Sequence, residues 1–167
     1  MDKFSRDLDE NLVQKVEMLA KRHQLNNITA IRCNKLTSEP CFIVRGNDLV
    51  RLFTGKDIIA IAIYQEAFDL VGDETQNIWI ENLLSRIEYD GELDKFQIQK
   101  PEIEFTEGMY NVYKDDLIAS LVQAKEICKS LKEAEKEKQK EKQKEYHKKY
   151  NERKKARKAA AAEDDLI

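Results

Sequence analysis

The chain has 167 residues, of which 37% are charged and 41% hydrophobic, and its net charge is −3. The hydrophobic share is enough for a folded core, so the composition excludes a wholly disordered chain. No run of about 18 apolar residues occurs, which excludes an ordinary transmembrane helix. Three cysteines without CxxC spacing exclude a disulfide scaffold and a zinc ribbon, and they favour a reducing cytoplasm.

The charge is strongly segregated along the chain. Residues 1–124 carry a net charge of −8, residues 125–158 a net charge of +8 and residues 163–167 a net charge of −3. Such asymmetry is more informative than the total. It predicts an acidic globular domain (1–131), a basic solvated single helix (132–158) and a flexible acidic-hydrophobic tip (159–167).

The N-terminal part predicts one helix and two strands. Ser5 is expected to cap the helix, and its apolar residues recur at a spacing of three and four: Leu8, Leu12, Val16 and Leu19. Two β-branched runs, residues 28–33 and 41–44, follow and predict a strand pair. In that arrangement Cys33 and Cys41 would face each other as buried thiols.

The central part begins with a predicted turn at residues 45–48 and an ambiguous segment, 49–53, that fits a short strand or one helical turn. Residues 58–64 have no polar side chain before Tyr64 and therefore predict a strand buried on both faces. Asp73 and Gln76 have the spacing of a capping box. They open a predicted helix of about four turns, whose apolar face is Ile78, Trp79, Leu83, Leu84 and Ile87.

Residues 96–99 alternate apolar and polar side chains, which predicts a half-exposed strand. A last helix is expected from about Thr106, with one apolar side formed by Leu117, Leu121, Ile127, Cys128 and Leu131. The fold class is therefore α+β: a small mixed sheet of three or four strands with three helices, followed by a long charged C-terminal helix. The irregular order of helices and strands argues against a doubly wound sheet.

The basic helix contains a Glu-Lys-Gln-Lys repeat in which each Glu precedes a Lys by three residues, as in Glu141 and Lys144. These residue types favour helix, and no Gly or Pro interrupts them. An apolar seam is missing, which excludes a coiled coil. We expect a solvated helix that frays towards its end, and the alternative to a binding role is a solubilising tail without a specific ligand.

Cations and tyrosines gather in the second half of this helix and indicate contact with nucleic acid, because cations neutralise phosphates and tyrosines stack on bases. We expect that binding to be weak, non-specific and salt-sensitive. A membrane-binding helix is disfavoured because no Leu, Ile, Phe or Trp is available to insert. The candidate residues are Tyr146, Lys148, Lys149, Tyr150, Arg153, Lys154, Lys155, Arg157 and Lys158.

The acidic tip ends in Asp164, Asp165, Leu166 and Ile167. It resembles the tips of bacterial and phage single-stranded-DNA-binding proteins, and the resemblance implies a partner protein with a basic rim and an apolar pocket. Two alternatives stay open. The tip is a frayed tail whose acidic residues offset the charge of the basic segment, or it masks the basic helix of the same chain.

Catalytic motifs are missing: the chain has no GxxxxGK[ST], GxGxxG, GxSxG or HExxH. We therefore assign no catalytic residue, no metal ligand and no cofactor. Glu66, Asp69 and Glu74 follow the buried strand and would serve a metal-dependent hydrolase, which is the rival interpretation. The acidic residues at 90, 92 and 94 have a spacing that loosely resembles a calcium-binding loop. Such a loop requires Glu at its twelfth position, where this chain has Pro101, so a solvated turn is expected.

Residues 59–69, 73–84 and 87–98 resemble a family of small bacteriophage proteins labelled as metallopeptidases. The resemblance covers about residues 28–125 and implies a reduced, zinc-peptidase-like α+β fold. No histidine lies between Asn26 and Tyr146, so no zinc ligand can be carried over to this chain.

The sequence thus favours a non-enzymatic, phage-type accessory protein in the cytoplasm of an infected cell. Its acidic domain would engage a protein partner from the replication, recombination or host-defence machinery, and its basic helix would attach to nucleic acid. A virion-associated structural protein is a further alternative. No membrane partner is expected.

Overall fold

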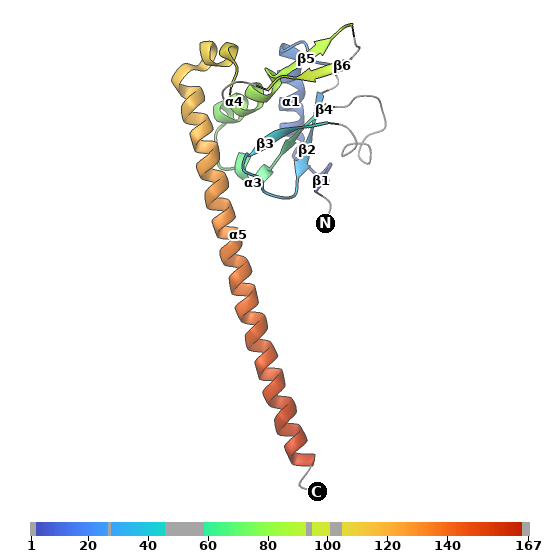
Figure 1. Ribbon diagram of the computed structural model, residues 1–167, viewed down its shortest axis with the longest axis vertical. Helices are drawn as coiled ribbons and strands as arrows, with labels where there is room; N and C mark the ends of the chain where they lie inside the picture. Colours follow the sequence, from blue (N-terminus) through green and yellow to red (C-terminus); the bar gives the residue numbers. More distant parts are fainter. Residues whose placement is uncertain (1–2, 27, 46–58, 93–94, 101–104, 165–167) are drawn as a thin grey trace. The chain divides into compact units, whose positions relative to one another are not determined.

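The computed structural model describes residues 3–26, 28–45, 59–92, 95–100 and 105–164 (Figure 1). The side chains of Lys95 and of residues 155–164 lie outside this description, as do the predicted segment 49–53 and most of the predicted turn at 45–48. The chain forms two compact units, residues 1–129 and 130–167, and each is described by itself. In the described part of the chain, no helix is both long enough and apolar enough to cross a bilayer.

Four strands form a mixed sheet in the order β1-β2-β4-β3. Central strand β4 pairs in parallel with β2, where Ile59 lies opposite Ile28, and antiparallel with β3, where Ile63 lies opposite Cys41. The strand bounds are β1 (Phe4–Ser5), β2 (Ile28–Cys33), β3 (Cys41–Arg45) and β4 (Ile59–Ile63). This sheet, its helices and the long C-terminal helix confirm the predicted α+β class.

The predicted pairing of β2 with β3 is wrong, because β4 lies between them. All five residues of β4 are apolar and buried. A strand with a neighbour on each side is better covered than an edge strand, so this sequence suits the central position. Cys33 and Cys41 consequently do not face each other. Cys33 lies opposite Phe4 of β1, and its thiol donates a hydrogen bond of 3.0 Å to the carbonyl of Lys35.

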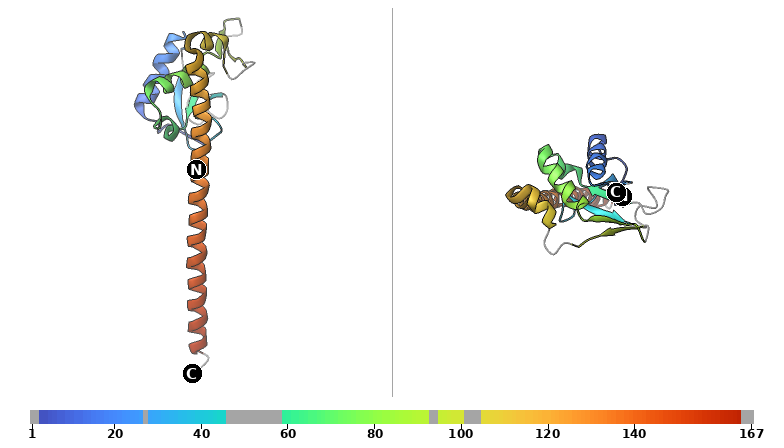
Figure 2. Two further views of the ribbon diagram at one scale, coloured as in Figure 1. Left: turned by 90° about the vertical axis from the view of Figure 1, so that its left-hand side faces the viewer. Right: turned by 90° about the horizontal axis from the view of Figure 1, so that it is seen from above.

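The two faces of the sheet follow the alternation of β4. Its isoleucines pack into the main core with helices α1 (Glu10–Arg22) and α4 (Asp73–Leu84). Its alanines, Ala60 and Ala62, belong to a second cluster on the other face, which also holds Phe4, Ile31, Cys33 and Val44. Successive side chains of a strand point to opposite faces. Both helices pack on the isoleucines and therefore lie on the same side of the sheet (Figure 2).

Helix α1 begins later than predicted. Ser5 belongs to β1, where it pairs with Arg32, and the cap is Asp9, whose carboxylate accepts a 2.8 Å hydrogen bond from the amide of Asn11. The predicted apolar face is confirmed, since Leu8, Leu12, Val16 and Leu19 are all buried. Ser5 is used in the sheet, and Asp9 takes its place as the cap, because Asp is one of the strongly preferred N-cap residues.

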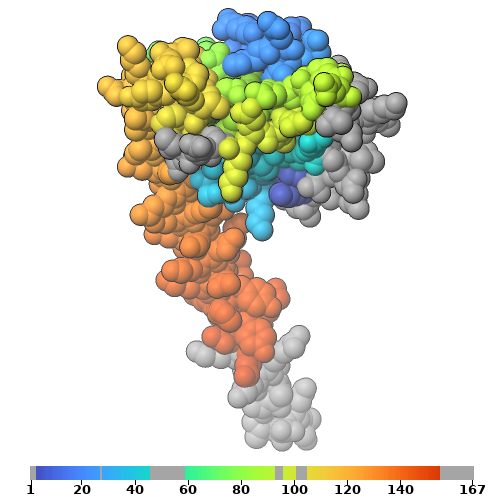
Figure 3. Space-filling model, turned by 45° about the horizontal axis from the view of Figure 1, so that its top comes forward, coloured from blue at the N-terminus to red at the C-terminus, as the bar shows by residue number. Residues whose placement is uncertain are grey.

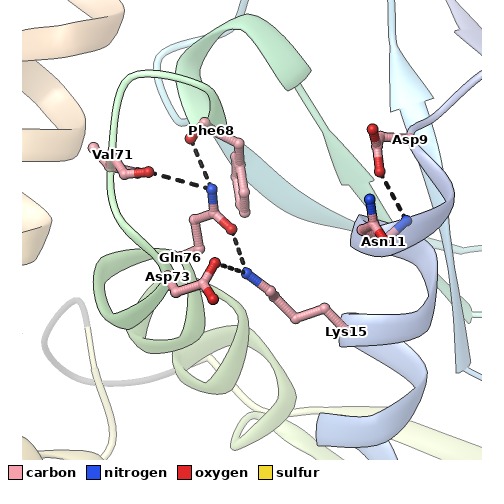
Figure 4. Close-up of polar contacts among 7 residues, drawn as sticks. All are labelled: Asp9, Asn11, Lys15, Phe68, Val71, Asp73 and Gln76. Atoms are coloured by element: carbon pink, nitrogen blue, oxygen red, sulfur yellow. Dashed lines mark hydrogen bonds and ion pairs between the residues drawn. The ribbon is translucent and has the colours of Figure 1, made fainter.

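Helix α4 has no capping box: its N-cap is Gly72, and no side chain caps it. The Gln76 amide instead donates to the carbonyls of Phe68 and Val71, which belong to the segment around the short helix α3 (Gln65–Phe68). Its carbonyl oxygen accepts from Lys15 of α1, whose ammonium lies 2.7 Å from Asp73 (Figure 4). The two residues therefore connect helices rather than cap one.

Helix α4 also ends earlier than predicted, at Leu84, and Ile87 starts a strand. Strands β5 (Ile87–Asp90) and β6 (Lys95–Ile98) form an antiparallel hairpin on the surface of the domain (Figure 3). The rings of Tyr89 and Phe96 meet edge to face at 5.4 Å across this hairpin. Such cross-strand aromatic pairs stabilise a two-stranded ribbon.

The C-terminal helix α5 (Glu107–Asp164) is interrupted at Lys114, where φ is 47° and ψ is −122°. Before this kink, the Tyr113 hydroxyl donates a hydrogen bond to Glu81 of α4. After it, Leu117 and Cys128 are buried as predicted, whereas Leu121, Ile127 and Leu131 are half-buried. The helix continues to Asp164, beyond the expected end of the basic helix at residue 158.

Candidate nucleic-acid interface

The basic helix presents its side chains to solvent: residues 133–154 are all exposed. Its sequence explains why it is helical without an apolar face, because Glu, Lys, Gln and Ala all have high helix propensity. Any ligand of this segment must therefore be bound by charged, amide and tyrosine side chains rather than by an apolar groove.

The two tyrosines lie on one face of this helix. Tyr146 and Tyr150 are 68% and 55% exposed and four residues apart, a spacing that puts them one above the other. Arg153 and Lys154 follow three and four residues after Tyr150 and lie on the same side. We call Tyr146, Tyr150, Arg153 and Lys154 the tyrosine face.

Four glutamates of this helix lie on the opposite side. Glu137 and Glu141 precede the two tyrosines by nine residues, and at 3.6 residues per turn nine residues are two and a half turns. Each of these glutamates therefore points about 180° away from its tyrosine. We call the four acids on this side the glutamate row; they are Glu137, Glu141, Glu145 and Glu152.

Two further predicted cations, Lys149 and Lys148, are less available to a ligand of the tyrosine face. Lys149 lies 2.7 Å from Glu145, and this ion pair raises the pKa of Lys149 and lowers that of Glu145. Lys148 follows Glu141 by seven residues and therefore lies on the side of the glutamate row. The side chains of Lys155, Arg157, Lys158 and Asp164 lie outside the described part, and so do residues 165–167.

The domain contains a cavity of about 140 Å³ beside Cys41. Its lining combines the apolar side chains of Trp79 and Leu83 with the polar groups of Asn82 and Arg86. Burial raises the pKa of the Cys41 thiol well above its ordinary value, and nearby Glu39 and Cys128 act in the same direction. Cys41 is therefore a neutral thiol at physiological pH and not an activated nucleophile.

The carboxylates of the rival hydrolase interpretation do not converge. Glu66 forms an ion pair with Arg32, and Asp69 follows the end of α3. Glu74 lines a different hollow, of about 240 Å³, together with Asp116 and the buried Ser120. Within the described part of the chain, no three His, Cys, Asp or Glu side chains lie close enough to share a metal ion.

The predicted solvated turn after β5 has the hydrogen bonds expected of one. Asp90 accepts a bond of 3.0 Å from the amide of Glu92 and another from the side chain of Gln97. Both carboxylate oxygens of Asp90 therefore accept hydrogen bonds within the hairpin. Asp94, the third acid of the calcium-like pattern, lies outside the described residues.

Comparison with protein-family models, with curated proteins and with solved structures gave no match. The resemblance to the phage metallopeptidase-like family therefore stays a prediction.

Proposed function

We propose that this protein is a non-enzymatic accessory binding protein that attaches to nucleic acid through its C-terminal helix. The tyrosine face carries the proposal: two exposed rings and two cations lie together, and the glutamate row points the other way. Arg153 and Lys154 would neutralise phosphates, and the tyrosines would contact bases. A few such contacts support weak binding that is not specific for sequence.

The domain has a different proposed role. The net charge of −8 over residues 1–124 repels phosphates, so the domain is poorly suited to bind nucleic acid over its own surface. We propose that it engages a protein partner, as does the tip with Asp164, Asp165, Leu166 and Ile167. In the phage-type interpretation, which rests on the sequence resemblance, this happens in the cytoplasm of an infected cell.

A charge-reversal experiment tests the attachment to nucleic acid. The full chain, the double variant Arg153→Glu/Lys154→Glu and a control, Lys144→Glu/Lys148→Glu, are titrated with a fluorescent oligonucleotide at about 50 and 200 mM salt. We expect the wild-type affinity to fall with salt and the Arg153/Lys154 variant to bind much more weakly than the control. The control makes the same change in charge on the side of the glutamate row, because Lys144 and Lys148 follow Glu137 and Glu141 by seven residues.

Two results would contradict the proposal. If the wild type does not bind at low salt, the C-terminal helix is not an attachment site. If both double variants lose the same affinity, only the overall charge matters and the tyrosine face has no special role.

The proposed protein partner requires a separate experiment. Affinity capture with the full chain is compared with capture by the variant Leu166→Ser/Ile167→Ser, which leaves the charge of the tip unchanged. A partner that binds the tip through an apolar pocket should be lost from the variant. A partner that both proteins retain would assign the binding to the domain instead.

A further inference from the structure

The rings of Tyr146 and Tyr150 are separated along the helix by about 6 Å, since each residue of an α-helix rises about 1.5 Å. The described aromatic neighbour of this pair is His147, which meets Tyr146 edge to face at 6.1 Å. Tyr146 and Tyr150 nevertheless stay 68% and 55% exposed, so both rings are accessible to planar ligands. Successive unpaired bases present such planar surfaces.

From this geometry we infer that the tyrosine face selects single-stranded nucleic acid over duplex. The inference rests on the proposed function and adds the class of ligand. One base stacks on Tyr146 and another on Tyr150, while Arg153 and Lys154 contact the phosphates of the same strand. In a duplex, the flat surfaces of the bases are covered by their neighbours, so the rings have no comparable partner.

The glutamate row supports the same ligand. The major groove of duplex DNA is about 12 Å wide, and an α-helix with its side chains is about 10–12 Å across. A helix seated in this groove has phosphates on both of its flanks, which would bring Glu145 and Glu152 towards negative charge. A single strand contacts one face of the helix and leaves the glutamate row in solvent.

The ion pair of Lys149 with Glu145 affects the same choice. Lys149 lies beside the tyrosine face, and its 2.7 Å contact directs its ammonium towards the glutamate row. A cation beside the tyrosine face that lacked such an ion pair would attract the phosphates of duplex and single strand alike. Arg153 and Lys154 neutralise the phosphates of either form of nucleic acid, so the two rings carry the selectivity.

The test compares single-stranded oligothymidine with a duplex of the same length, by fluorescence anisotropy at low salt. The proteins are the full-length wild type, Tyr146→Ala, Tyr150→Ala, Tyr146→Phe/Tyr150→Phe and the control His147→Ala. Alanine is a strong helix former, and circular dichroism checks that each variant keeps its helix. The control removes a ring one residue away from the tyrosine face.

We expect the wild type to bind the single strand more tightly than the duplex. Each Tyr→Ala change should weaken single-strand binding by about five- to a hundredfold, as is typical of the loss of a base-stacking ring. The double Phe variant should stay within about twofold because phenylalanine also stacks. His147→Ala should have a much smaller effect than either tyrosine variant.

The outcomes separate this inference from the proposed function. Equal affinity for duplex and single strand, or Tyr→Ala variants that bind like the wild type, would overturn the single-strand inference and leave attachment through cations intact. Absence of binding to both probes would overturn the inference and the proposed attachment together.

Discussion

The indole Nε1 of Trp79 donates a hydrogen bond of 3.0 Å to the main-chain carbonyl of Ser120 and so connects α4 to α5 within the domain. Trp79 is only 2% exposed, and its ring meets Phe68 edge to face at 5.3 Å. One side chain therefore joins two helices and the short helix α3. Its loss should therefore destabilise the whole domain rather than one element.

We expect Trp79→Phe to lower the free energy of unfolding by about 1–3 kcal/mol, because the hydrogen bond is lost and a smaller ring leaves space in the core. Urea unfolding followed by circular dichroism measures the effect, since the variant has no tryptophan. Tyr146→Phe, at an exposed position, is the control and should stay within about 0.5 kcal/mol. A Trp79→Phe change as small as that would show that the contact is dispensable.

The contacts of Lys15 predict unequal effects for its two partners. Asp73 has a side chain that is 88% exposed, so we expect Asp73→Asn to cost no more than about 1 kcal/mol and to cost less at high salt. Gln76 is half-buried and donates to two main-chain carbonyls, so Gln76→Ala should cost about 1–3 kcal/mol. Urea unfolding monitored by Trp79 fluorescence compares the two. An Asp73 variant as unstable as the Gln76 variant would contradict this order.

The parts of the fold that could be predicted from sequence are those decided by local pattern. Strand β4 is buried along its whole length, as its Ile and Ala residues indicate, and the apolar faces of α1 and α4 follow helical spacing. The pairing of β2 and β3 could not be predicted, because it depends on where a third strand inserts. Ile87 fits the helical pattern of α4 equally well, and its pairing with Ile98 decides for a strand.

Helix caps also depend on distant neighbours. Ser5 and Asp9 are both good cap residues, and the pairing of Ser5 with Arg32 in the sheet leaves the cap to Asp9. Gln76 has the spacing of a capping box, but carbonyls near α3 and the ammonium of Lys15 compete for its amide. Local patterns thus identify residues that form polar contacts without naming their partners.

For the candidate site, the sequence predicted the residue types, and the part of α5 that follows the kink at Lys114 places them on faces. The nine-residue offset between glutamates and tyrosines was present in the sequence, and only an unbroken helix converts it into two opposite sides. The ion pair of Glu145 forms with Lys149, four residues on, rather than with Lys148. At positions with two adjacent lysines, spacing alone does not choose between them.

All three cysteines are buried, which predicts that the native protein is inert to thiol reagents. Burial raises the pKa of Cys41, so the reactive thiolate is scarce even at mildly alkaline pH. We expect Ellman's reagent at pH 8 to detect no fast-reacting thiol in the folded protein and three thiols in urea. A thiol that reacts within seconds in the native state would instead indicate an activated cysteine.

Tyr113 predicts how stability changes at alkaline pH. Burial and the hydrogen bond to Glu81 raise its pKa from 10.0 to about 12. Between these two values the unfolded state loses the phenolic proton while the folded state keeps it, so stability from this group is complete below pH 10 and is lost as the pH approaches 12. The same contact holds the first part of α5, just before the kink at Lys114, against α4.

The measurement is the free energy of unfolding of the wild type and of Tyr113→Phe from pH 9 to 12. At pH 9 we expect the variant to be less stable by about 1 kcal/mol, because Glu81 loses its hydrogen-bond donor. This difference should shrink steadily between pH 10 and 12, while the other tyrosines and the lysines affect both proteins alike. A difference that stays constant over this range would show that the hydroxyl of Tyr113 titrates equally in the folded and unfolded states.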